Sequence, residues 1–225
     1  MLTLRPETAG LSEKPTLPEY HHIECAVELD SSYRQRLSSF ADAVGSVLGH
    51  RTELARWASS VELRRVGGDD VLAGWCLASE QWTREESAFR IGPLHVHGKP
   101  VVMGWPASPA LHPELLSLSM CLWSQDLADP LDSERIRPTL IPVLEATAVQ
   151  LHLALDQVDV FLTNEVTDGR PVDALWGILP ARAYWDCELA VPSPKSRLRF
   201  KPPPDFRSSS RGAVSVFWRR LQLGQ

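Results

Sequence analysis

Two pairs of histidines are the first residues in this sequence that could take part in chemistry. His95 and His97 are two positions apart, so on a β-strand they would share one face, a spacing that some strand-borne metal sites use. His21 and His22 are adjacent, and on a strand they would point to opposite faces. Because no carboxylate can be assigned beside either pair, we predict solvated or hydrogen-bonded histidines and no bound metal.

A pair of carboxylates is the second candidate for chemistry. Nucleases and glycosidases need two or more acidic groups that converge on one point. Asp186 and Glu188, in the segment WDCEL, would share a face if that segment is an extended strand. They are the best carboxylate pair in the sequence, and we interpret them as the polar face of a strand.

Neither the cysteines nor the glycines form a known reactive motif. The cysteines lie 45 to 66 residues apart among apolar neighbours, which predicts buried, reduced thiols at Cys25, Cys76, Cys121 and Cys187. GxSxG, GxGxxG, GxxxxGK[ST] and the Q/RxxGxG/A segment of acetyltransferases are all absent. Gly67-Gly68 precedes two aspartates that would repel phosphate, which indicates a turn. We therefore predict no catalytic, metal or cofactor site.

Composition and charge limit the class of protein. The 225 residues are 44% apolar and 23% charged, which is typical of a globular domain that needs no disulfide or metal to fold. The sequence shows no secretory signal and no apolar stretch near the roughly 20 residues of a membrane span, so we expect a cytoplasmic protein. Arginine outnumbers lysine 19 to 4, which suggests a bacterial, GC-rich genome.

Charge is divided unevenly along the chain. Residues 1–190 carry 15 basic and 27 acidic side chains, a net of −12, whereas residues 191–225 carry 8 basic and 1 acidic, a net of +7. A basic tail can bind nucleic acid or membrane lipid, or it can fold back onto its own acidic body. We favour folding back, because the tail ends in the strand-like AVSVFW.

The order of predicted elements indicates the fold class. Apolar alternation or helical periodicity predicts strands at 21–29, 61–66, 71–78, 88–97, 100–105, 114–123, 158–166 and 212–221, with helices at about 32–48, 52–58 and 138–155. Residues 174–191 fit two strands or a short helix and a strand. Consecutive strands favour antiparallel pairing, so we predict an α+β fold with a mainly antiparallel sheet and two main helices packed on one face.

The predicted domain organisation is simple. Residues 1–19 contain three prolines and no periodicity, and we predict a flexible N-terminal arm. Residues 20–225 are predicted to form a single domain, in which the proline-, serine- and arginine-rich segment 192–212 lies at the surface.

An acidic segment is the best candidate for contact with a partner. Residues 124–135 are predicted to form a loop before the third helix, and clustered carboxylates accelerate association with a basic surface. Tryptophan is a preferred interface anchor, and one flanks the loop. The candidate partner-binding residues are Trp123, Asp126, Asp129, Asp132 and Glu134.

The first strand and the segment SSYRQRLSSFADAVGSVLGHRTELARW resemble the opening of bacterial immunity proteins. In that family, which is paired with restriction-endonuclease-like toxins of type VI and contact-dependent secretion systems, a strand precedes a helix of the form xxRLxxFxxAL and an aromatic residue near Trp57. VDVFLTNEV and ALWGILP are similar to later parts of the family, so the resemblance covers about half of the chain. It implies an antitoxin that binds a cognate nuclease effector in the cytosol, and it assigns no individual functional residue.

Three functions follow from these observations. The leading hypothesis is a non-enzymatic immunity or inhibitor protein that binds and neutralises a cognate toxin. The alternatives are a small enzyme of acyltransferase-like or hydrolytic type, and a nucleic-acid-associated regulator that uses residues 195–220. We expect no membrane partner, and we regard nucleic acid as the less favoured partner.

Overall fold

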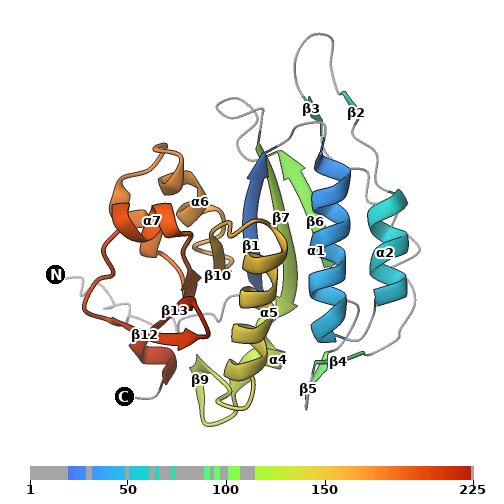
Figure 1. Ribbon diagram of the computed structural model, residues 1–225. Coiled ribbons are helices and arrows are strands. Elements are labelled where there is room, and N and C mark those ends of the chain that lie inside the picture. The colour runs from blue at the N-terminus through green and yellow to red at the C-terminus, as the bar shows by residue number, and fades with distance from the viewer. Residues whose placement is uncertain are drawn as a thin grey trace, which may run out of the picture.

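The fold is built around a seven-stranded β-sheet, as the computed structural model in Figure 1 shows. The structure describes residues 20–28, 32–48, 51–60, 64–65, 72–73, 89–91, 94–96, 101–106 and 115–223. The strand order is β12-β13-β11-β10-β1-β7-β6, and every neighbouring pair is antiparallel. The strands are β1 (Tyr20–Glu28), β6 (Val101–Pro106), β7 (Leu115–Trp123), β10 (Val160–Asn164), β11 (Leu189–Val191), β12 (Phe206–Arg211) and β13 (Val214–Arg219).

Three helices cover one face of this sheet. α1 (Tyr33–Leu48) and α5 (Ile141–Ala154) lie side by side against it, and α2 (Arg51–Ser60) packs along α1 (Figure 1). The α+β fold with a mainly antiparallel sheet is confirmed. Gly45 allows the close approach of α1 and α2, because a Cβ atom there would lie 2.8 Å from Cα of Arg51. Pro142 lies in the first turn of α5, where its missing N–H costs little.

Alternation along β1 determines which side chains enter the main core. Ile23, Cys25 and Val27 face α1 and α5, and β7 contributes Leu118, Met120 and Leu122 to the same layer. The intervening positions of β1, including His22 and Glu24, therefore point to the opposite face. Both of these polar residues are buried.

Short elements and a second, aromatic core cover part of the opposite face. These elements are α6 (Arg170–Leu175), the 3₁₀ helix η1 (Ala181–Trp185) and α7 (Pro194–Arg199). Tyr184 stacks on Phe200 with ring centroids 4.1 Å apart, and its edge meets Phe161 at 5.1 Å. Both faces of the β10–β11–β13 half are thus buried, since this core also includes Ala190 and Phe217.

The basic C-terminal segment forms part of the domain. After α7, β12 and β13 form a hairpin at one edge of the sheet, and η2 (Arg220–Leu223) follows. Glu145 of α5 holds this edge: its Oε2 accepts hydrogen bonds from Nε and Nη2 of Arg211, and its Oε1 accepts from Trp218 Nε1 at 3.0 Å. The prediction that this segment folds back onto the body is confirmed.

Several predicted strands are shorter than expected. β2 (Arg64–Arg65) pairs with β3 (Leu72–Ala73), and β4 (Phe89–Ile91) pairs with β5 (Leu94–Val96). The single strand predicted at 88–97 is therefore wrong, because its two halves pair with each other. The predicted N-terminal arm, residues 1–19, and the predicted turn at 97–99 lie outside the described residues. None of the helices in the described ranges has the length and apolar character of a membrane span.

Candidate functional site

The predicted acidic loop at 124–135 is an ordered helix and hairpin. α4 (Ser124–Leu127) leads into β8 (Ala128–Asp129), which pairs with β9 (Asp132–Ile136). The prediction of a loop is wrong because Asp129 closes a tight turn: its Oδ1 accepts a hydrogen bond from the N–H of Leu131 at 2.9 Å. We call residues 128–136 the acidic hairpin.

The base of the acidic hairpin is fixed to the body of the protein. Ile136 is buried, and its N–H donates to Oε1 of Gln222 at 2.7 Å. Nε of Arg137 donates to the carbonyl of Ala128 at 2.7 Å. The tip, in contrast, projects from the lower end of the molecule beyond α5 (Figure 1), and Leu131 is 96% exposed there.

The structure brings two of the five predicted partner-binding residues to the hairpin tip. Asp129 closes the turn, and Asp132 lies opposite it and forms an ion pair with Arg135 at 3.0 Å. Trp123, Asp126 and Glu134 lie at the end of β7, in α4 and in β9, and their side chains lie outside the described part. The exposed leucine between the two aspartates was not among the predicted residues, because a single apolar residue in a polar segment carries no periodic signal.

The best carboxylate pair in the sequence does not converge. Asp186 follows η1 and forms an ion pair with Arg170 at 2.8 Å, whereas Glu188 accepts a hydrogen bond from Nε2 of Gln222 at 3.0 Å. The strand begins only at Leu189, so the shared strand face assumed from the sequence does not exist. His97 and the side chain of His95 lie outside the described residues.

A different polar cluster lies on the opposite face of β1. Glu24 is 1% exposed, and its carboxyl group accepts hydrogen bonds from Thr163 Oγ1 at 2.9 Å and from the N–H of Gly169 at 3.2 Å. Asp168 is 31% exposed, and its Oδ2 lies 3.8 Å from Nε2 of His22. Sequence reasoning missed the cluster because Glu24 alternates with apolar residues along the strand. A glutamate that faces solvent on a half-buried strand gives the same pattern.

Burial controls the protonation of this cluster. It raises the pKa of Glu24 well above the ordinary value, and the negative charge of Asp168 raises that pKa further. Burial also lowers the pKa of His22, against the opposing effect of Asp168. Glu24 therefore keeps its proton to a higher pH than an exposed glutamate does. Within the described residues, no group of three histidine, cysteine or acidic side chains could hold a metal ion.

The described cysteines are buried free thiols. Cys25 lies in the main core and Cys187 in the aromatic core, and burial raises the pKa of both thiols. A raised pKa keeps the unreactive protonated form at neutral pH. This confirms the prediction for these two residues. Cys76 and the side chain of Cys121 lie outside the described part.

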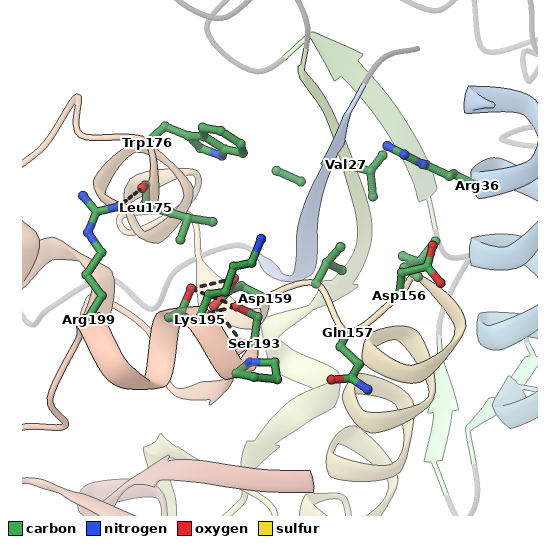
Figure 2. Close-up of a pocket in the computed structure, with 15 residues that line it drawn as sticks. Val27, Arg36, Asp156, Gln157, Asp159, Leu175, Trp176, Ser193, Lys195 and Arg199 are labelled. Carbon is green, nitrogen blue, oxygen red and sulfur yellow. Dashed lines mark hydrogen bonds between the residues drawn. The ribbon is translucent and has the colours of Figure 1, made fainter. Parts of the chain in front are cut away.

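A pocket at the other end of α5 is a further feature that sequence reasoning missed. It has a volume of about 720 Å³ and lies between α1 on one side and α6 and α7 on the other (Figure 2). Its lining includes Trp176 and Lys195 from one wall and Arg36 from the other. No local pattern could have revealed it, because the lining comes from distant segments of the chain.

The floor of this pocket is a completed hydrogen-bond network. The carboxylate of Asp159 accepts hydrogen bonds from Tyr184 Oη at 2.6 Å, from the N–H of Ser193 at 3.1 Å and from Ser196 Oγ at 2.9 Å. Ser193 also caps α7 by accepting a hydrogen bond from the N–H of Ser196. These contacts fix α7 relative to β10, so the wall that carries Lys195 is rigidly placed.

No family model, curated protein or solved structure matches this chain in the three comparisons with known proteins.

Proposed function

We propose that this chain is a non-enzymatic inhibitor of the immunity-protein type, which binds a cognate bacterial toxin in the cytoplasm and neutralises it. The observation that carries the proposal is the acidic hairpin, where Leu131 is 96% exposed between Asp129 and Asp132. The toxin expected from the sequence resemblance is a nuclease effector.

The geometry of the hairpin suits a docking element. An exposed leucine alone is ordinary on a protein surface. Leu131, however, lies at the end of a hairpin whose base is anchored through Ile136 and Arg137. Because the tip is already ordered, binding costs little conformational entropy, and the apolar side chain can enter a pocket of the partner.

The charge of the hairpin suits the expected partner. A nuclease holds its substrate through a basic surface that contacts phosphates. Asp129 and Asp132 present carboxylates beside the exposed leucine, and residues 1–190 have a net charge of −12. Complementary charge accelerates association and orients the two proteins. The hairpin would therefore approach the same surface that the nuclease uses for nucleic acid.

The experiment is co-expression with the nuclease toxin that the proposal expects to be encoded next to this gene, scored by rescue of cell growth. Leu131→Asp places a third carboxylate at the tip and is expected to abolish rescue, because a charged group cannot enter an apolar pocket. Leu198→Asp is the matched control: Leu198 is 88% exposed on α7, far from the hairpin in the fold. Thermal melting of both variants checks that the fold is retained.

Two results would count against the proposal. One is rescue that is undiminished by Leu131→Asp, which would remove the hairpin from the interface. The other is a failure of the unaltered chain to rescue growth or to form a complex with the toxin, which would remove the inhibitor function itself.

A further inference from the structure

The pocket between α1 and α7 combines an aromatic surface with positive charge. Trp176, which is 39% exposed, and Leu175 form the apolar side of the wall contributed by α6. Lys195 stands on α7, and Arg36 faces it from α1. In Figure 2 the ammonium group of Lys195 and the guanidinium group of Arg36 both point into the hollow, and the indole of Trp176 lies above it.

The net charge of the lining is positive. Three cations line the pocket, Arg36, Lys195 and Arg199, against the two carboxylates of Asp156 and Asp159. Asp159 already accepts three hydrogen bonds from neutral donors in the floor, so its oxygens are engaged while its negative charge remains, and the formal charge of the lining is +1. An anion in the hollow would thus meet two cations from opposite walls.

The size of the pocket fits a small organic ligand. A volume of about 720 Å³ falls within the roughly 300–1,000 Å³ of known small-molecule sites. Tryptophan stacks on planar bases with a gain of about 1–3 kcal/mol. A phosphate group carries close to two negative charges at neutral pH, which matches two cations better than a single carboxylate does.

We propose that this pocket binds a free mononucleotide, with the base against Trp176 and the phosphate between Lys195 and Arg36. This site is independent of the acidic hairpin, because the two lie at opposite ends of α5. A helix of 14 residues is about 21 Å long, so ligands at the two sites would not touch.

The test is isothermal titration of the full chain with AMP, adenosine, inorganic phosphate and benzoate. AMP is expected to bind with a dissociation constant below about 1 mM. Adenosine and phosphate, which each lack one half of the ligand, are expected to bind at least about tenfold more weakly. Benzoate, which carries a ring with one negative charge, is expected to bind more weakly than AMP.

Variants assign the binding to this pocket. Lys195→Met and Trp176→Leu are each expected to weaken AMP binding by about tenfold. Arg197→Met is the matched control, because Arg197 is exposed on the same helix and does not line the pocket. Leu131→Asp is expected to leave AMP binding unchanged.

Three outcomes would overturn the proposal. They are an absence of saturable AMP binding, AMP binding that Lys195→Met and Trp176→Leu leave unchanged, and equal affinities for phosphate or benzoate and AMP. Since none of these outcomes concerns a protein partner, the failure of this site would leave the inhibitor function untouched.

Discussion

At the scale of single residues, buried ionisable groups determine how this protein responds to pH. His21 lies on the core face of β1, opposite Leu122, and its Nδ1 forms a hydrogen bond with Ser124 Oγ at 2.8 Å. Burial, together with the smaller effect of the neighbouring His22, lowers the pKa of His21 to about 4. His21 is therefore neutral in the folded protein at pH 5, where an exposed histidine is charged.

His21→Gln should reduce the loss of stability in acid. Between pH 6.5 and 4, His21 binds a proton in the unfolded chain but not in the folded chain. The free energy of unfolding therefore falls as the pH falls. Between pH 7 and pH 5, the free energy of unfolding of the unaltered protein should fall by about 2 kcal/mol more than that of the variant. Urea unfolding of both proteins at the two pH values measures the difference. Equal losses in the two proteins would mean that His21 titrates normally in the fold.

Glu24→Gln should have the opposite pH dependence. The folded pKa of Glu24 is raised, so above about pH 4.5 the unfolded chain releases a proton that the folded chain retains. The stability contribution of Glu24 is complete below pH 4.5 and is lost as the pH rises, whereas glutamine does not titrate. The variant should gain stability relative to the unaltered protein between pH 5 and pH 8, as measured by urea unfolding. A constant difference across this range would contradict the raised pKa.

At the scale of elements, one carboxylate connects a helix to the edge of the sheet. Glu145 of α5 is buried and accepts hydrogen bonds from Ser209, Arg211 and Trp218, which belong to β12 and β13. The edge strand β12 is otherwise exposed along most of its length. The position of β12 thus depends on this one side chain more than on apolar burial.

Glu145→Gln should loosen the sheet edge without unfolding the protein. The variant loses the ion pair with Arg211, and because Arg211 is about half exposed, we expect a cost of only about 1–2 kcal/mol. Amide hydrogen exchange should accelerate in β12 while β1 and β10 remain protected. Arg207→Gln, on the same exposed strand, serves as the control and should cost less than about 0.5 kcal/mol. A uniform increase in exchange across the sheet would contradict a local role.

Elements with strong periodicity could be predicted from the sequence, and those held by distant contacts could not. The alternation in β1 and β7 and the apolar stripe of α5 predicted those elements to within a few residues. The acidic hairpin was missed because its base depends on Gln222, which is 86 positions from Ile136. The same reason applies to the pocket, whose wall is placed by contacts between Asp159 and Ser196.

At the scale of the whole molecule, the two proposed binding surfaces lie at opposite ends of α5. The acidic hairpin precedes this helix, and the positively lined pocket follows it. Two surfaces of opposite charge at opposite ends can bind two different ligands without competition. The exposed hairpin is the basis of the proposed inhibition. Two carboxylates elsewhere are held by neighbours: Glu24 accepts a hydrogen bond from Thr163, and Asp186 forms an ion pair with Arg170.

We propose that this protein acts by docking rather than by chemistry. The most direct measurement is a titration of the purified cognate toxin with this chain, which follows residual nuclease activity at two incubation times. Docking predicts that nuclease activity is lost when this chain and the toxin are present in equimolar amounts. It also predicts that the amount of chain required is the same at both incubation times. Inhibition by far less than one chain per toxin, increasing with time, would show turnover and would contradict the account.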